Sequence, residues 1–215
     1  MSHTDHKKII NKVAKKILSS HGITQKGQSR IWLDDNGWFV TVIEFQPFHG
    51  RQGTTLNIGV NFNWYEEEYF SFDIGYRQDI DFVDYDGNED MFSEEIEKLC
   101  HLALNKILEF REKFKNLDNA KLSILNNTFT SEEIWGSYHK GTICGLTNEY
   151  AKKNEYYQKI LDNNETYEWL SELKSRVNLL ENNISNHNDF SKKVIEIIKK
   201  TRTLKKLKEK EIILS

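Results

Sequence analysis

The segment Leu56–Arg77, LNIGVNFNWYEEEYFSFDIGYR, alternates apolar and polar residues through most of its length. A period of two is the pattern of β-strands, in which successive side chains point to opposite faces. With a tight turn at the glutamates Glu66–Glu68, the two halves pair as an antiparallel hairpin. One face of this hairpin then carries apolar cross-strand pairs, which stabilise a sheet. These pairs are Phe62 with Phe72, Val60 with Ile74, and Ile58 with Tyr76.

The same register determines the opposite face, because the side chains of a strand alternate strictly. The preceding strand extends this face, with Glu44 beside Asn57, and one register of the hairpin before it adds Arg30 and Trp32. The polar face therefore combines charged residues with asparagine and glycine. Its pairs between the last two strands are Asn63 with Ser71, Asn61 with Asp73, Gly59 with Gly75, and Asn57 with Arg77.

This polar face is a candidate recognition surface. Asparagine is depleted in strands, and two paired glycines leave a dent in which a ligand or another backbone can approach. Positions where local rules fail are enriched in function, and two arginines are available for a carboxylate or phosphate. Alternatively, the face meets water, or a later helix packs at the glycines. The candidate ligand-binding residues are Arg30, Glu44, Gln46, Asn57, Gly59, Asn61, Asp73, Gly75 and Arg77.

The flanking sequence predicts the rest of an α+β fold. Apolar residues at helical spacing from Ile9 to Leu18 indicate an amphipathic helix that stops at Gly22. Two alternating runs on either side of Asn36-Gly37 indicate a β-hairpin, and Pro47 ends the second of these strands. We therefore expect an N-terminal helix followed by a four-stranded antiparallel β-meander.

The second half of the chain is expected to be helical. Ser93 is the expected cap of a long helix, with glutamates in the first turn. Further helices are expected at about 120–125, 131–144, 149–161, 166–180 and 189–208, with a helical hairpin that turns near Gly145. We expect an α+β domain over residues 1–118 and a helical extension or small helical domain over residues 119–215.

The charge of the chain limits its partners. Its 215 residues carry a formal net charge of -3, which does not favour a general nucleic-acid binder. Basic residues nevertheless concentrate between Lys192 and Lys210, on an expected amphipathic helix. This helix either packs on the helical half or binds an acidic partner, RNA or an anionic surface. No run is apolar enough for a membrane span and the N-terminus is unlike a signal peptide, so we expect a cytoplasmic protein without a membrane partner.

One acidic segment partly matches a calcium-binding loop. Oxygen ligands occupy its first, third, fifth and twelfth positions, but the sixth position is Glu89 instead of the glycine that the sharp turn needs. An acidic turn before the next helix is the alternative. We expect no metal site and no cofactor. The four matching residues are Asp84, Asp86, Asn88 and Glu95.

The two cysteines lie near histidines in the sequence. Cys100 is next to His101, and Cys144 follows His139 by five positions. On a helix, five positions are about 140 degrees around the axis, so His139 and Cys144 would not face each other. We expect core cysteines and surface histidines, and the histidines show no zinc-binding spacing.

The run from His21 to Trp64 resembles an uncharacterised bacterial domain-of-unknown-function family (number 4304). The shared features are a Gly-x-x-Lys-x-Gly-like approach to the first strand, an aliphatic-x-Phe-Gln strand end, and a Leu/Ile-Asn-x-Gly-Val strand. The resemblance covers about the first half of the chain and implies a bacterial cytosolic α+β protein, without an activity, cofactor or catalytic residues. The matching residues here are Ile43, Phe45, Gln46, Leu56, Asn57, Gly59 and Val60.

These features predict a non-enzymatic binding module with a protein partner, such as an immunity or defence-associated protein. Nucleic-acid binding through the basic C-terminal helix is the less favoured partner hypothesis. The alternative function is a hydrolase or transferase on the polar sheet face. In that case Glu44 or Asp73 would be the acid/base, and Arg30 or Arg77 would hold an anion.

Overall fold

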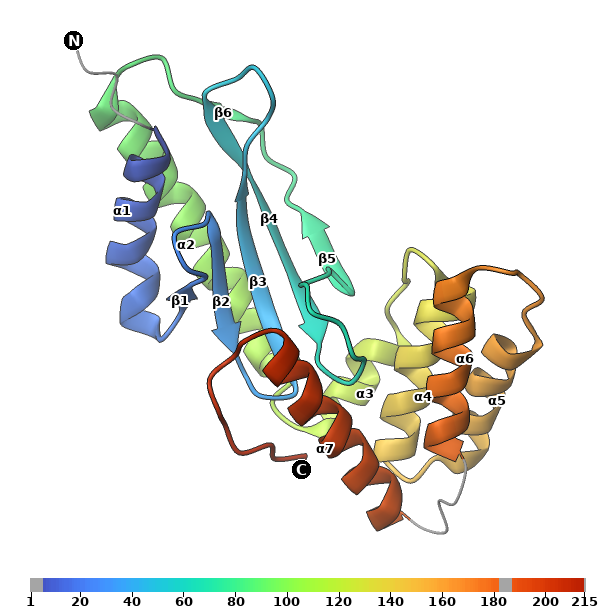
Figure 1. Ribbon diagram of the computed structural model, residues 1–215. Helices are drawn as coiled ribbons and strands as arrows, with labels where there is room; N and C mark the ends of the chain where they lie inside the picture. The colour runs from blue at the N-terminus through green and yellow to red at the C-terminus, as the bar shows by residue number, and fades with distance from the viewer. Residues whose placement is uncertain (1–5, 182–186, 215) are drawn as a thin grey trace. The chain divides into compact units, whose positions relative to one another are not determined.

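The structure is a computed structural model that describes residues 6–181 and 187–214 (Figure 1). These residues form two compact units. The first consists of the described residues within Met1–Phe62 and Tyr69–Arg111, and the second of those within Asn63–Glu68 and Glu112–Ser215. The first unit contains the sheet and the second is helical, which confirms the expected α+β class with a helix-rich C-terminal half.

The sheet of the first unit is antiparallel. Its strands follow the order β1 (Thr24–Gln25), β2 (Ile31–Asp35), β3 (Phe39–Gln46), β4 (Gly53–Phe62) and β5 (Ile74–Arg77). The four expected strands are β2 to β5 in meander order. The short strand β6 (Val83–Asp84) pairs with the first residues of β4. Among the described residues, no strand pairs with the outer edge of β5.

The predicted register of the central strands is confirmed. Asn57 lies opposite Arg77 and Gly59 opposite Gly75, while Glu44 of β3 lies opposite Asn57. The ladder between β4 and β5 ends at Val60 and Ile74, however. The pairs expected beyond this point, including Phe62 with Phe72, are therefore absent from the ladder.

The prediction that Arg30 and Trp32 lie on the same face of the sheet as Glu44 is wrong. Ile31, and not one of these two residues, lies opposite Glu44. Asp35 lies opposite Val40, and residues 36–38 connect the two strands. One residue more or less in a hairpin connection exchanges the two faces of a strand. Arg30 and Trp32 consequently belong to the other face of the sheet, away from Glu44.

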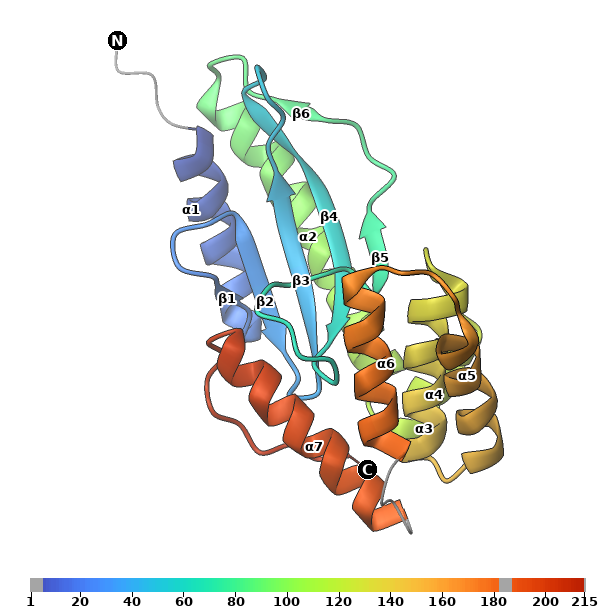
Figure 2. The same cartoon turned by 45° about the vertical axis from the view of Figure 1, so that its right-hand side comes forward.

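Two helices cover that opposite face of the sheet. Helix α1 (His6–Leu18) and helix α2 (Glu89–Lys113) lie on the same side of the strands in both views (Figures 1 and 2). Arg111 of α2 donates from Nη2 to Asp34 Oδ1 of β2 at 2.6 Å. The apolar residues of α1 and of β3 and β4 that face each other are buried, among them Ile10, Leu18, Phe45, Ile58 and Val60.

The expected cap of α2 at Ser93 is wrong. The helix begins at Glu89, because Asn88 Oδ1 accepts the backbone N–H of Met91 at 3.1 Å. Ser93 lies inside the helix, where its hydroxyl donates to the carbonyl of Glu89 at 2.7 Å. An asparagine is as good an N-cap as a serine, so residue type alone did not separate the two positions.

The helical unit contains the helices expected from the sequence. They are α3 (Leu117–Leu125), α4 (Ser137–Leu146), α5 (Tyr150–Asp162), α6 (Glu168–Glu181) and α7 (His187–Leu204), with a π-helical turn at Glu132–Gly136 before α4. Helices α4 and α5 form the hairpin that was expected near Gly145. Every residue of α4 is buried, so α4 is the central helix of this unit. No described helix has the length and apolar character needed to cross a membrane.

The segment 63–68 does not form the expected tight turn at Glu66–Glu68. It packs within the helical unit, where the buried Trp64 donates from Nε1 to His139 Nδ1 at 2.9 Å. Tyr138 donates its hydroxyl to the Trp64 carbonyl at 2.7 Å, and Thr201 donates to the Tyr65 carbonyl at 3.0 Å. These contacts come from α4 and α7, which the local sequence of the segment cannot indicate.

Candidate functional site

Four of the predicted site residues form one hydrogen-bonded row across three strands, which we call the amide strip: Glu44, Gln46, Asn57 and Arg77. Asn57 donates from Nδ2 to Glu44 Oε2 at 2.8 Å and to Gln46 Oε1 at 3.1 Å. Arg77 donates from Nη2 to the same Gln46 oxygen at 2.6 Å. The structure thus brings these four residues together.

Asn57 is the central residue of the amide strip and is fully buried. Its amide nitrogen supplies both hydrogen bonds to the neighbouring strand. Its Oδ1 atom is buried as well and has no hydrogen-bond partner among the described residues. An unpaired buried acceptor costs about 1–3 kcal/mol, and such atoms in native proteins require an explanation.

Arg77 is the exposed end of the amide strip. Its guanidinium lies 5.3 Å from the centroid of the Phe48 ring and 5.8 Å from that of Tyr76. Within the described part of the chain, Arg77 forms no ion pair. Arg51 has a similar setting, 4.0 Å from the Phe82 ring, but it is paired with Asp84 at 2.5 Å. Of these two stacked arginines, only Arg77 keeps an uncompensated charge.

A second group of predicted residues forms a separate cluster at the other end of β5. Asn61 donates from Nδ2 to Ser71 Oγ at 2.7 Å and to Asp73 Oδ2 at 3.2 Å. Asp73 Oδ2 also accepts the backbone N–H of Phe62 at 2.7 Å, and Ser71 donates to Asp73 Oδ1 at 3.0 Å. The Asp73 carboxylate thus holds the chain where the β4–β5 ladder ends.

The glycine pair between these two groups is not an open dent. A Cβ atom at Gly59 would lie 2.6 Å from Phe72 Cδ1 and 2.6 Å from the carbonyl oxygen of Ile74. The ring of Phe72 therefore occupies the space above Gly59. The prediction of a dent for a ligand is wrong, because Phe72 lies outside the ladder and folds over the strand instead of pairing with Phe62.

Arg30 lies apart from the other predicted residues. It donates from Nη1 to the carbonyl of Gly53 at 3.0 Å, and its Nη2 lies 2.8 Å from His6 Nε2 of α1. This follows from the register of β2, which directs Arg30 to the face that the helices cover. Its role here is to connect the start of α1 to the start of β4.

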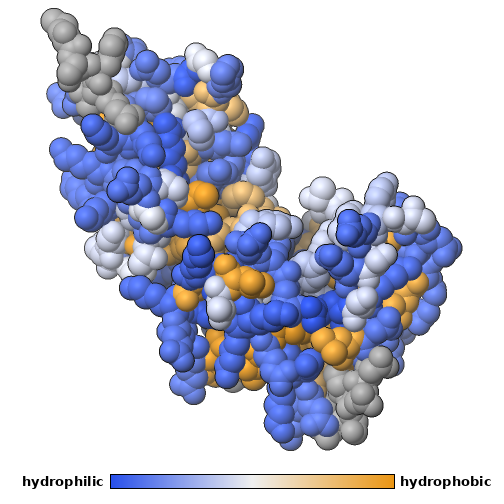
Figure 3. All heavy atoms as spheres, in the orientation of Figure 1, coloured by the Kyte–Doolittle hydropathy of each residue, from blue (hydrophilic) through white to orange (hydrophobic). Residues whose placement is uncertain are grey.

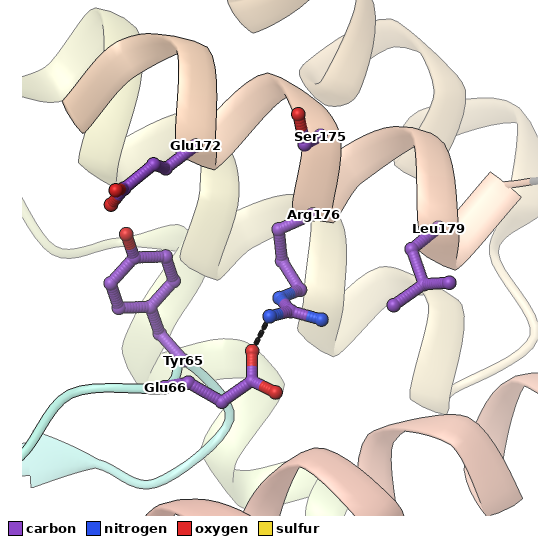
Figure 4. A pocket seen from close by; sticks show the side chains of 6 residues that line it. All are labelled: Tyr65, Glu66, Glu172, Ser175, Arg176 and Leu179. Carbon is purple, nitrogen blue, oxygen red and sulfur yellow. Dashed lines mark ion pairs between the residues drawn. The ribbon is translucent and has the colours of Figure 1, made fainter. Parts of the chain in front are cut away.

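The helical unit contains a hollow of about 420 Å³ that the sequence did not indicate (Figure 4). Arg176 and Glu66 point toward each other in it and form an ion pair. Glu66 also pairs with Lys200 at 3.1 Å, so the charges at the base of the hollow largely compensate one another. The sequence missed this site because segment 63–68 was expected to be a turn. The lining residues are Tyr65, Glu66, Glu172, Ser175, Arg176 and Leu179.

Aromatic rings extend from this hollow to the surface of the helical unit. Tyr65 meets Trp135 edge to face, with ring centroids 4.9 Å apart. Trp135 stacks on Trp169 at 5.9 Å, and Trp169 stacks on Tyr167 at 5.7 Å. Each ring thus covers part of its neighbour, while Tyr167 and Trp169 remain exposed. Of these rings, Tyr65 is the one that lines the hollow.

The cysteines and His139 are interior residues without signs of nucleophilic chemistry. Burial raises the pKa of Cys100 to about 12 and that of Cys144 to about 11, so both thiols are protonated at neutral pH. The expectation of surface histidines is wrong for His139, which is buried. Burial lowers the pKa of His139 to about 3. The neutral ring accepts the hydrogen bond of Trp64.

The acidic segment before α2 has structural partners. Asp84 pairs with Arg51, and Asp86 Oδ1 accepts the backbone N–H of Asn88 at 2.9 Å. Glu95 lies in the second turn of α2, so it does not close a loop around a central ion. In the described ranges of the chain, no group of three His, Cys, Asp or Glu side chains is placed to hold a metal ion.

Comparison of the chain with models of known protein families, with curated proteins and with solved structures gives no match. The resemblance of the first half to a bacterial family therefore stays a prediction. Figure 3 shows a mostly hydrophilic surface on the side seen in Figure 1, where apolar residues appear in separate groups.

Proposed function

We propose that this protein is a non-enzymatic binding module that holds a partner protein at the β5 edge of its sheet through Arg77. The proposal rests on one observation, which is the uncompensated positive charge of Arg77. Its guanidinium is exposed and held in place, yet no described carboxylate neutralises it. A guanidinium in this state can donate to a carboxylate of a partner through two parallel hydrogen bonds.

The amide strip reduces the entropic cost of such binding. A mobile arginine loses about 2 kcal/mol of rotamer freedom when it is fixed. Arg77 is already hydrogen bonded to Gln46 and lies over the ring of Phe48. Gln46 is in turn held by the buried Asn57. Rigidity before binding improves affinity because less freedom remains to be lost.

The position of Arg77 in an edge strand favours an extended partner segment. Strand β5 has no strand on its outer side among the described residues. An edge of this kind can accept a further strand, with main-chain hydrogen bonds for affinity and side chains for specificity. We therefore propose an extended segment with an acidic residue as the partner. A role as an immunity or defence-associated protein, in the cytoplasm of a bacterium, remains part of this proposal.

The hydrolase or transferase alternative has less support. It needs Glu44 or Asp73 to act beside an anion-holding arginine. The carboxylate of Asp73 already accepts hydrogen bonds from Asn61, Phe62 and Ser71. Arg30 lies on the other face of the sheet. Glu44 accepts a hydrogen bond from Asn57, which ties it to the amide strip.

The proposal is tested by affinity capture of tagged wild-type protein from its native host at moderate salt, beside the variants Arg77→Ala and Arg51→Ala. Both arginines are exposed and stacked on an aromatic ring, but Arg51 is already neutralised by Asp84. We expect the wild type to capture a stoichiometric protein partner. The amount captured should fall at least tenfold with Arg77→Ala and stay unchanged with Arg51→Ala. Equal retention by the two variants would refute the role of Arg77.

A further inference from the structure

The chain reverses direction directly after α7. The N–H of Leu207 donates to the carbonyl of Arg202 at 2.9 Å, and that of Lys206 donates to Thr203 at 3.1 Å. This pattern is a Schellman motif, in which the residue in the left-handed conformation is usually glycine. Here it is Lys206, with a φ of 56°. A side chain in this conformation costs about 1–2 kcal/mol, so a lysine at this position breaks a local rule.

The reversal brings lysines of the returning chain beside those of the helix. Arg202 is buried and donates from Nη2 to the carbonyl of Lys208 at 2.5 Å, which ties the returning chain to α7. Lys199, Lys206, Lys208 and Lys210 then surround a hollow of about 450 Å³, which we call the basic pocket. As a straight helix, the same sequence would distribute these lysines along its length.

Three of the four lysines around the basic pocket have uncompensated charges. Glu209 is the acidic residue in its lining. Lys199, Lys206 and Lys208 have no ion pair with any residue that the structure describes. Nearby lysines differ in this respect, since Lys200 pairs with Glu66 and Lys205 pairs with Glu67, each at 3.1 Å. Three ammonium groups without an ion pair among the described residues therefore lie around this one hollow.

We propose that the basic pocket binds the phosphate groups of a nucleotide or of a nucleic-acid strand. Several ammonium groups around one hollow repel one another, and an anion with more than one charge removes this repulsion. Phosphate groups suit lysine, which acts on them as a point charge. The size of the hollow lies within the range of small-molecule sites, about 300–1,000 Å³. The site lies in the helical unit and uses none of the residues of the amide strip.

Fluorescence anisotropy with labelled single-stranded RNA and DNA of about 20 nucleotides tests this proposal, because phosphate contacts make affinity depend on salt. The test variant is Lys199→Gln, Lys206→Asn and Lys208→Gln, where asparagine tolerates the left-handed backbone at position 206. The control variant changes the same charge at exposed lysines outside the pocket, as Lys152→Gln, Lys159→Gln and Lys192→Gln. Melting temperatures of all three proteins show that each is folded.

We expect the test variant to bind at least tenfold more weakly and the control to bind like the wild type. The slope of log affinity against log salt should fall by about 0.7 for each lost phosphate contact. Displacement of the strand by ATP or tripolyphosphate would identify a nucleotide-sized ligand, and resistance to displacement would identify the strand itself.

Three outcomes would overturn the assignment. The first is that neither the oligonucleotides nor ATP binds. The second is an equal loss of affinity in both variants, which would mean that the general positive charge of the surface binds the strand and that the basic pocket does not. The third is equally tight binding of a polyglutamate peptide, which indicates an acidic protein partner.

Discussion

The two compact units differ in the way they bury polar side chains. In the sheet unit, the fully buried polar residues on the amide strip and in the Asp73 cluster are the neutral amides Asn57 and Asn61. The buried charge of the sheet unit is the anion Asp34, paired with Arg111. In the helical unit cations are buried as well, and the Lys205 side chain is fully buried beside Glu67. Neutral amides can hold an exposed Arg77 without cancelling its charge, whereas the buried charges of the helical unit compensate one another.

The largest effect is expected from breaking the buried charge pair. Lys205→Met removes the ammonium that pairs with Glu67 at 3.1 Å and leaves that carboxylate in a buried setting. Removing one partner of a buried pair costs about 3–5 kcal/mol. We expect a loss of this size in the free energy of unfolding, measured by chemical denaturation.

The double variant with Glu67→Gln is the control for this prediction. It should recover much of the lost stability, because the remaining amide carries no charge that needs a partner. A loss below about 1 kcal/mol for Lys205→Met would contradict the view that the helical unit depends on this pair.

A medium effect is expected when a methyl side chain is added at one glycine in each unit, by Gly59→Ala in the sheet and Gly141→Ala in α4. In the sheet, a Cβ at Gly59 meets the backbone carbonyl of Ile74 at 2.6 Å, while at Gly141 of α4 it meets the ring of Tyr157 at 2.5 Å. Overpacking costs about 1–3 kcal/mol, which exceeds the gain of about 1 kcal/mol that alanine brings to a helix. We expect both alanine variants to unfold at lower denaturant, Gly59→Ala more so.

A backbone carbonyl in a ladder cannot move aside, whereas a ring can shift slightly. Addition of Phe72→Ala to Gly59→Ala should therefore recover little stability. Full recovery would mean that the ring alone, and not the strand pairing, requires glycine at this position.

The smallest effect is expected in the change of stability between pH 7 and pH 5.5, and it distinguishes the interior of the helical unit from its surface. The pKa of His139 in the folded protein is about 3, below the value of about 6.5 for the unfolded chain. As the pH falls below 6.5, the unfolded state takes up a proton first. Folding stability should therefore decrease toward acid pH, by at most about 1.4 kcal/mol per pH unit from this residue, and mainly between pH 6.5 and 3.

Denaturation at pH 7 and pH 5.5 measures this effect, with His139→Gln compared with the exposed His101→Gln. Glutamine cannot take up the proton, so His139→Gln should reduce the loss of stability between the two pH values. An identical pH dependence in both variants would show that His139 is not responsible.

Local sequence patterns were sufficient for the strands, their central register and most helices. The alternation in β4 and β5 determined which residues lie opposite each other, because a period of two leaves only two choices of face. Asn57, Gly59 and Arg77 could therefore be placed from the sequence. Helices α3 to α6 follow from apolar spacing for the same reason, since each depends on residues a few positions apart.

The tertiary structure decided which of these residues have partners. Trp64 and His139 are 75 positions apart, and Lys205 and Glu67 are 138 positions apart, so no local pattern connects them. The ring of Phe72 over Gly59, the hollow at Arg176 and the basic pocket beyond α7 likewise depend on where the chain returns in space. A hydrogen bond or a charge is compensated by whatever lies within a few ångströms, and chain folding alone brings those groups together.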